Sequence, residues 1–295
     1  MQTVVTLIGA PASGGLPAAL ARHVAERLPG APRPLWLAEN LACDLACEDG
    51  DARAVAAAAN AALDGAPVDC VVQPGANRRK RLLVADMDST IIGQECIDEL
   101  ADAVGLKDRV SAITDRAMRG EIEFEPALRE RVALLKGLHR DALARVYDER
   151  ISLRPGARRL VATMRAQGAY SALVSGGFTF FTERIAAAAG FDENRANVLE
   201  FDGDGLAGTV REPILSRQAK LDTLSELTRR LAIDPSLTLA IGDGANDLAM
   251  ITAAGLGVAF HAKPAVAAAA HARIDHGDLV ALLYIQGYRA DEIVG

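Results

Sequence analysis

The sequence predicts an α/β fold: a doubly wound parallel sheet with a helical cap inserted after its first strand, preceded by a small α+β domain. Strand-like and helix-like segments alternate over the first eighty residues. From residue 81 on, apolar strands end in acidic or glycine-rich turns that lead into helices. Between the first of these strands and residue 151, about sixty residues show helical periodicity alone. A chain of 295 residues has room for both parts, since an average domain takes roughly 150 residues.

Composition excludes several classes of protein. Half of the residues are hydrophobic, which rules out a disordered chain, and 32 basic against 39 acidic residues give a net charge of −7, which argues against a nucleic-acid binder. The four cysteines lack zinc-like CxxC pairing, so we expect buried thiols in a reducing compartment. The N-terminal apolar run has no preceding Lys or Arg, and no apolar tract reaches the roughly 20 residues of a membrane span. We therefore expect a cytoplasmic protein without nucleic-acid or membrane partners.

The first eighty residues are expected to form a strand, a helix, two strands, a helix and a strand. In order, these elements are predicted at residues 3–9, 15–28, 34–48 (two strands around Asn40), 51–65 (a helix capped by Asp51) and 68–74. The order βαββαβ is the ferredoxin-like pattern. We therefore predict a small domain over residues 1–78, with the polar, basic stretch 75–81 as a linker to the rest of the chain.

Three apolar strands are predicted in the second part, residues 79–295. They lie at 81–88, 169–177 and 237–244, and each is followed by a turn and a helix. Such alternation is typical of a doubly wound parallel sheet, whose ligands bind at the carboxyl ends of the strands. We therefore expect functional side chains where these strands end.

A helical cap is predicted over residues 93–150, because a βα connection usually takes only a handful of residues. The core would then comprise residues 79–92 and 151–295. The strings GQECID (93–98) and ISLRPG (151–156) are the expected hinges of the cap. Residues 197–210 predict a hairpin, with glycines supplying its turn.

Two carboxylates follow the first core strand. Asp86 and Asp88 stand where an apolar strand ends, and like charges there repel each other and are costly to remove from water. A divalent cation would remove this conflict, and oxygen ligands on short stems suit Mg²⁺. A DxD pair alone is also compatible with a polar strand end before the Ser89–Thr90 turn, or with a metal-dependent glycosyltransferase.

A second acidic group follows a later strand. Asp243, Asn246 and Asp247 lie in AIGDGANDLAM, where glycines permit a tight turn and a helix is expected from Ala245 onward. One such loop could be an ordinary capped turn. Two acidic strand ends on the ligand face of one parallel sheet instead favour a metal site.

Two further elements favour an anionic ligand. Ser175, Gly176 and Gly177 end a strand and precede a helical run, so a hydroxyl and backbone N–H groups would face an anion, although a flexible loop is the alternative. Lys220 belongs to a helix whose apolar positions face the sheet, and it is one of only five lysines. A helical lysine is usually solvated, so its position alone does not decide between surface and site.

The elements DMDST, SGG, a lysine and GDGxND, in this order, resemble the haloacid dehalogenase superfamily of phosphotransferases over residues 81 to about 260. The longer strings DMDSTIIGQECIDELA and LVSGGF resemble the phosphoserine phosphatase family within it. The resemblance implies Mg²⁺-dependent hydrolysis of O-phospho-L-serine to L-serine and phosphate through an aspartyl-phosphate, the last step of serine biosynthesis.

The same resemblance assigns roles to single residues. Asp86 would be the nucleophile, and Asp88 would protonate the leaving alkoxide and later accept a proton from water. Asp86, the Asp88 carbonyl and Asp243 would hold Mg²⁺, with Asp247 acting through water. The phosphate would be held by Ser175, Gly176, Lys220, Asn246 and the backbone N–H of Ser89.

Substrate selection is expected from the cap. Arg131 lies on the apolar stripe of a predicted helix that includes Phe124 and Leu128, whereas Arg129 points elsewhere. A charge there is either a snorkelling side chain or a ligand for a buried anion. The resemblance implies that Arg131 is a ligand for a buried anion, namely the carboxylate of the substrate. The resemblance alone selects Glu95 for the substrate ammonium, and it assigns Met118 and Phe124 to shielding the substrate.

Other functions remain open at this point. A phosphotransferase on the same scaffold would pass the phosphoryl group to another amino-acid hydroxyl. Alternatively, the βαββαβ segment resembles ACT-type regulatory modules, which would make the chain an amino-acid-sensing homodimer with secondary phosphatase activity. A DxD glycosyltransferase would leave SGG, Lys220 and GDGAND unexplained.

Overall fold

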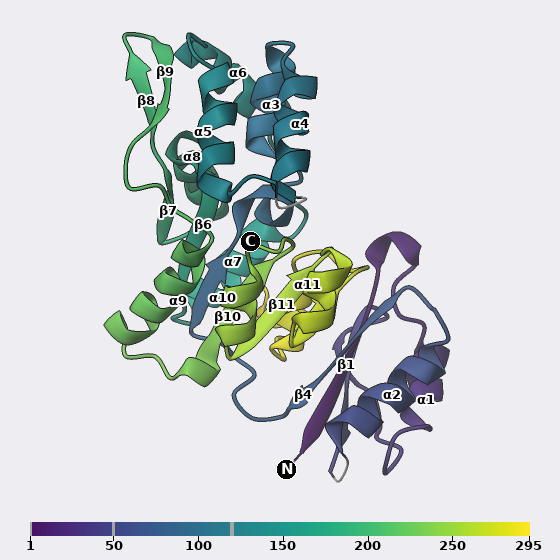
Figure 1. Ribbon diagram of the computed structural model, residues 1–295. Coiled ribbons are helices and arrows are strands. Elements are labelled where there is room, and N and C mark those ends of the chain that lie inside the picture. Colours follow the sequence, from purple (N-terminus) through teal and green to yellow (C-terminus); the bar gives the residue numbers. More distant parts are fainter. Residues whose placement is uncertain (1, 49–50, 119–120) are drawn as a thin grey trace.

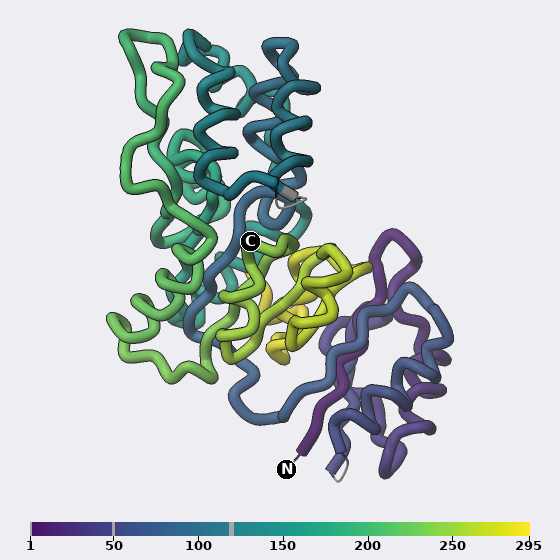
Figure 2. Tube along the Cα trace, in the orientation of Figure 1, coloured from purple at the N-terminus to yellow at the C-terminus, as the bar shows by residue number. Residues whose placement is uncertain are grey.

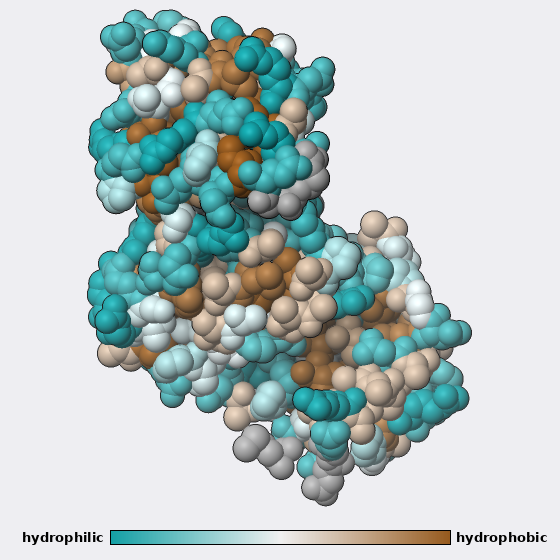
Figure 3. Space-filling view, viewed as in Figure 1, coloured by the Kyte–Doolittle hydropathy of each residue, from teal (hydrophilic) through white to brown (hydrophobic). Residues whose placement is uncertain are grey.

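The structure is a computed structural model that describes residues 2–48, 51–118 and 121–295. A helical bundle lies above the main sheet, and the N-terminal domain lies beside the sheet at the opposite end (Figure 1). The predicted α/β fold class is confirmed. In the described part of the chain, no helix combines the length and the apolar character needed to cross a membrane. On the face shown in Figure 3, apolar residues form separate patches within a largely hydrophilic surface.

The N-terminal domain has the predicted βαββαβ order. Its elements are β1 (Thr3–Gly9), a 3-10 turn (Pro11–Ser13), α1 (Ala18–Ala25), β2 (Leu35–Ala38), β3 (Ala42–Cys47), α2 (Ala52–Leu63) and β4 (Val68–Pro74). The strands form an antiparallel sheet in the order β2-β3-β1-β4. Helix α1 is shorter than expected, because the chain turns at Gly15 (φ +80°) and the Leu16 N–H donates to the Asn40 carbonyl at 2.7 Å.

The sheet of this domain packs against the C-terminal part of the core. Ile8 and Val71 belong to one apolar cluster with helix α12 (Ala281–Ile285). Gln73 Nε2 donates to the Ile285 carbonyl at 2.6 Å. The buried Asp69 carboxylate accepts backbone N–H groups of residues 275–277, the shortest at 2.7 Å. The N-terminal domain is therefore held to the core by buried contacts in addition to the connecting chain.

The core sheet is parallel, in the order β12-β11-β10-β5-β6-β7. Its strands are β5 (Leu82–Ala85), β6 (Tyr170–Phe178), β7 (Glu193–Asn197), β10 (Thr238–Gly242), β11 (Leu256–Phe260) and β12 (Ala272–Ile274). Helices α7 (Ala157–Ala166), α8 (Thr179–Ala189) and α12 cover one face, and α9 (Gln218–Arg230) and α10 (Leu248–Ala253) cover the other, while α11 (Pro264–Ala269) packs beside α10 and β11. The predicted doubly wound sheet is thus confirmed.

The side chains of β5 point alternately to the two faces of the core sheet, and helices cover both faces. Leu83 and Ala85 pack in the cluster that includes α7, α8 and α12, whereas Leu82 and Val84 pack in the cluster that includes α9 and α10. A strand buried on both faces reads as a continuous apolar run, as LLVA does here. Because β10, β5 and β6 are neighbours and parallel, their carboxyl ends meet at one edge of the sheet.

Four helices form the cap: α3 (Cys96–Ala103), α4 (Lys107–Met118), α5 (Phe124–Leu134) and α6 (Arg140–Arg150). The predicted hairpin is formed by β8 (Leu199–Asp202) and β9 (Gly205–Val210), and it packs against α5. The Gly137 N–H donates to the Leu206 carbonyl at 2.7 Å, and the Leu206 N–H donates to Leu138. The trace in Figure 2 shows the hairpin rising beside the cap helices. The cap therefore contacts a second part of the core besides its two connections.

Candidate active site

Asp86 follows β5 directly and is 5% exposed. Its Oδ1 accepts the Met87 N–H at 2.7 Å and lies 2.7 Å from Lys220 Nζ. Among the hydrogen bonds of the described residues, none involves Asp86 Oδ2, so this oxygen is available to a substrate. Burial and the nearby charge of Asp247 raise the pKa of Asp86 well above its usual value, while Lys220 acts in the opposite direction.

Lys220 faces the sheet from helix α9 and is 3% exposed. Its ammonium contacts two carboxylates, Asp86 at 2.7 Å and Asp247 at 2.5 Å. Burial alone would lower the pKa of Lys220, but the two carboxylates outweigh it and raise that pKa, so the side chain stays charged. A buried charge of this kind is retained only where it is paired.

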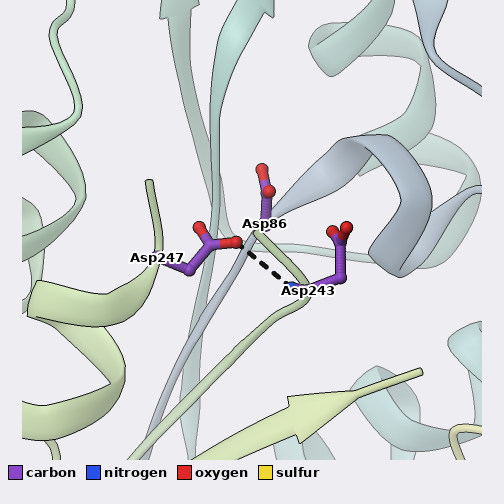
Figure 4. A group of neighbouring side chains, drawn as sticks. All are labelled: Asp86, Asp243 and Asp247. Carbon is purple, nitrogen blue, oxygen red and sulfur yellow. Dashed lines mark hydrogen bonds between the residues drawn. The ribbon is translucent and has the colours of Figure 1, made fainter. Parts of the chain in front are cut away.

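Three carboxylates meet beside this lysine. One oxygen from each of Asp86, Asp243 and Asp247 lies within 4.8 Å of the others. Figure 4 shows Asp86 and Asp243 at the adjoining ends of β5 and β10, and Asp247 at the start of α10. Burial and Asp247 also raise the pKa of Asp243. One ammonium offsets one of three negative charges, and clustered carboxylate oxygens are the ligands that hard divalent cations prefer. The residues present therefore fit a divalent metal ion.

The loop after β10 differs from the expectation in one detail. Helix α10 begins at Leu248 and not at Ala245. The Asp247 side chain turns back into the loop, where its Oδ2 accepts the N–H groups of Asp243 at 3.2 Å and Gly244 at 3.0 Å. These bonds hold an open turn in place of the first helical turn. They also leave Asp247 Oδ1 for Lys220.

Asp88 lies beside Asp86 in a turn over Met87–Ile91, whose backbone is not helical at Asp88 and Ser89. Its Oδ1 accepts the Cys96 N–H at 2.9 Å, and its Oδ2 accepts the Ser175 hydroxyl at 3.0 Å. Burial raises the pKa of Asp88, although these hydrogen bonds oppose the shift. A carboxyl with a raised pKa can hold a proton and donate it near neutral pH, as a general acid must.

The SGG segment closes the site from β6. The Ser175 hydroxyl accepts the Gly177 N–H at 2.8 Å while it donates to Asp88. A Cβ atom at Gly176 would lie 3.1 Å from the Phe124 ring, so this ring of the cap rests on the glycine. The cap is therefore packed down on the catalytic edge of the sheet.

The structure contradicts one expectation for Ser89. Its N–H was expected to face the phosphate, but it donates to the Gln94 carbonyl at 3.2 Å. The extended backbone of Asp88 (ψ 139°) sets the plane of the Asp88–Ser89 peptide, so this N–H faces the start of the cap. Asn246, by contrast, is exposed at the edge of the site, where its Oδ1 lies over Gly244.

Glu95, just before α3, lies near enough to Arg131 of α5 for its charge to act on the pKa of Arg131. The Ser89 hydroxyl donates to Glu95 Oε1 at 2.7 Å. Although part of Glu95 remains exposed, loss of water around its carboxyl and the nearby charge of Asp88 raise its pKa to about 7. Burial lowers the pKa of Arg131, while the charges of Asp98 and Glu95 act in the opposite direction. Arg131 Nη1 contacts the Thr114 hydroxyl at 3.4 Å.

Met118 ends α4, but its side chain lies outside the described part.

Sequence reasoning missed three groups at this site. Thr90 donates to Asp243 Oδ1 at 2.9 Å, the Cys96 N–H holds Asp88, and Arg154 donates to the Ser89 carbonyl at 3.0 Å. Thr90 lies in the DMDST string and could have been found there. The Cys96 N–H carries no sequence signal because it is a backbone group. Arg154 lies in the ISLRPG string, which predicted a hinge and not a contact with the turn.

Comparisons with known proteins agree with this geometry. Residues 83–252 match the haloacid dehalogenase-like hydrolase family. The chain is 46% identical over 217 residues to a phosphoserine phosphatase of Archaeoglobus fulgidus, covering 73% of this chain but 63% of that protein. It is 48% identical over 208 residues to a phosphoserine phosphatase of Albidiferax ferrireducens, covering 69% and 88%.

Two solved structures extend the similarity to the fold. A haloacid dehalogenase family hydrolase of Salmonella enterica superposes with a TM-score of 0.85 at 28% identity, covering 96% of this chain and 98% of that one. A phosphoserine phosphatase solved as a phospho-aspartyl intermediate analogue has a TM-score of 0.65 at 36% identity, covering 70% and 98%.

Proposed function

The chain belongs to the haloacid dehalogenase-like hydrolase family, and on this premise we propose that it hydrolyses O-phospho-L-serine to L-serine and phosphate with Mg²⁺ bound at the acidic cluster. The observation that carries the proposal is the placement of Asp86. Its carboxylate stands beside a buried lysine and two further carboxylates, with Asp88 next to it. Related proteins of the same family are named phosphoserine phosphatases.

The chain's own residues account for each proton and bond. Asp86 Oδ2 attacks phosphorus, and the bond from phosphorus to the serine oxygen breaks while Asp88 gives that oxygen its proton. Water then attacks the phosphorus of the aspartyl-phosphate and gives a proton back to Asp88. The bond from Asp86 Oδ2 to phosphorus breaks, which releases phosphate and restores the carboxylate. Lys220 offsets charge on the phosphoryl oxygens from within hydrogen-bond distance of Asp86. Mg²⁺, held by Asp86, Asp243, the Asp88 carbonyl and Asp247 through water, would supply the remaining positive charge.

The carboxylate and the ammonium of phosphoserine are expected to bind side chains of the cap. We assign the serine carboxylate to Arg131 and the ammonium to Glu95, because the charge of Glu95 acts on the pKa of Arg131 and Glu95 is itself acted on by the charge of Asp88. Phe124 rests on Gly176 and would cover the bound serine, as would Met118. Ser175, Gly176 and Asn246 are the further phosphate ligands in this proposal. Packing the cap down limits the water around the reacting phosphate while Asp86 attacks it.

The test is phosphate release by the full chain from phosphoserine, with Mg²⁺ and then with excess chelator. We expect turnover with the metal and at least about 100-fold less without it, since the metal neutralises the charge that repels the nucleophile. Free serine or threonine in the assay would reveal a phosphotransferase through a new phosphorylated amino acid. Equal kcat/KM for phosphoserine and p-nitrophenyl phosphate would contradict the substrate assignment.

Replacing Arg131 with Met should raise KM for phosphoserine about 10- to 100-fold, because a charge-assisted bond to the substrate carboxylate is lost. The matched control is Arg129→Met, on the same helix. Arg129 pairs with Glu125 and Glu212 at the surface, so its removal should leave KM unchanged. Hydrolysis of p-nitrophenyl phosphate, which has no carboxylate at that place, should be nearly unaffected in both variants. Equal losses on both substrates in Arg131→Met would contradict the assigned role.

The regulatory role of residues 1–78, their ACT-like character, a homodimer and the place in serine biosynthesis stay predictions. So does the division of the chain into residues 1–78 and 79–295, with a cap over 93–150. Docking of the N-terminal sheet on α12 is compatible with transmission from that domain to the core.

A further inference from the structure

The chain passes between core and cap twice, and the two passages run side by side. Ile92 and Leu153 form an antiparallel bridge. The Arg154 N–H donates to the Ile91 carbonyl at 2.9 Å. Gln94 exchanges two hydrogen bonds with Ser152, at 3.1 and 3.2 Å. The turn that carries the catalytic carboxylates is thus tied to the returning segment.

Ser89 is the strained point of that turn. Its φ of +55° lies in the left-handed region that L side chains rarely adopt. Its N–H donates to the Gln94 carbonyl, its hydroxyl donates to Glu95, and its carbonyl accepts from Arg154 Nη2 at 3.0 Å. Such a strained conformation persists only where the surroundings determine it. The N–H of Ser89 belongs to the same peptide as the Asp88 carbonyl, so whatever holds Ser89 also aims that carbonyl.

Arg154 contacts the middle and the end of the turn with one side chain. Its Nη2 donates to the Ser89 carbonyl and its Nε donates to the Ile92 carbonyl at 3.3 Å. The guanidinium lies 5.7 Å from the centroid of the Phe260 ring, which supports it from β11. A rigid planar fork holds two carbonyls in a fixed geometry, whereas the ammonium of lysine, on a flexible stem, leaves their directions free.

We propose that Arg154 is a positioning residue for phosphoryl transfer: by clamping Ser89 and Ile92 it keeps Asp86 and Asp88 aligned with the substrate phosphate. The inference rests on the proposed function for its reaction class. Arg154 itself contacts carbonyls of the turn and acts through them. Small misplacements of reacting groups are costly, since an error of about 1 Å can reduce the rate by 100-fold.

The test compares Arg154→Met, Arg154→Lys and the control Arg158→Met. Arg158 is exposed and lines the same cavity, of about 370 Å³, as Arg154. Hydrolysis of phosphoserine and of p-nitrophenyl phosphate is measured for each protein, together with thermal unfolding. In Arg154→Met we expect kcat to fall about tenfold or more on both substrates, with KM for p-nitrophenyl phosphate changed less than about threefold. Arg154→Lys should be intermediate, and Arg158→Met should match the unmodified chain.

The following results would contradict the proposed role of Arg154. A kcat within about twofold of the unmodified chain in Arg154→Met would overturn it, as would an equal fall in Arg158→Met or a loss confined to phosphoserine. If Arg154→Met does not fold, Arg154→Lys decides by the same comparison, and an unchanged kcat there overturns the inference. If the unmodified chain releases phosphate only from p-nitrophenyl phosphate, the proposed substrate fails while the Arg154 comparison remains decisive.

Discussion

Replacing Asp86 with Asn should lower the turnover of phosphoserine by about 10⁴-fold or more, because an amide cannot form the covalent bond to phosphorus. The change keeps the size of the side chain, and the amide oxygen can still accept the Met87 N–H. Binding should therefore suffer less than chemistry. The measurement is steady-state release of phosphate at saturating phosphoserine and Mg²⁺, compared with the unmodified chain.

Asp202→Asn is the control for this change. Asp202 is exposed on the hairpin at the end of β8, so the same loss of charge there should leave turnover unchanged. Acid quenching of the unmodified chain during turnover, followed by peptide mass analysis, should locate one phosphoryl group on the peptide that contains Asp86. A label on another peptide, or residual turnover above about 1% in Asp86→Asn, would contradict the nucleophile assignment.

The strand ends that carry this chemistry were predictable from the sequence, because apolar runs end there in Asp86, Ser175 and Asp243. Strand order was not. The three groups meet only because β5 lies between β10 and β6, and this order depends on packing between segments far apart in the chain. Helical spacing placed Arg131 on an apolar face, but its meeting with Glu95 requires α3 and α5 to share one bundle.

The details that were missed depend on contacts over long sequence separations. The left-handed turn at Ser89 is held by Arg154, which lies 65 residues later in the chain. No local sequence pattern predicts this contact. The docking of the N-terminal sheet depends on Gln73 and the Ile285 carbonyl, which are 212 residues apart. Local propensity reports hydrophobic faces and turns. It does not predict which buried polar groups form hydrogen bonds with each other, because tertiary packing determines those pairs.

Replacing Lys220 with Met should affect both activity and stability. Turnover should fall about 10³-fold, since a preorganised positive charge on the phosphoryl oxygens is removed. In the presence of chelator the free energy of unfolding should fall by about 3–5 kcal/mol, because the buried carboxylates of Asp86 and Asp247 lose their common partner. Added Mg²⁺ should restore part of this stability, since a ligand that binds only the folded chain stabilises it by mass action.

The pH dependence gives this prediction a definite sign. Burial and Asp247 already raise the pKa of Asp86, and removing Lys220 removes a charge that lowers it. The folded chain then holds a proton that the unfolded chain releases near pH 4, so stability should decrease as pH rises from about 4 toward the raised pKa. Urea unfolding of Lys220→Met with chelator at pH 5 and 8 should show this decrease, more steeply than the unmodified chain. The control, Lys136→Met, removes an exposed charge of the cap and should not change the slope. If the free energy of unfolding of Lys220→Met does not change between pH 5 and 8, or if Mg²⁺ does not change its pH dependence, the prediction is wrong. The buried carboxylates would then not depend on positive charge from Lys220 or from the metal.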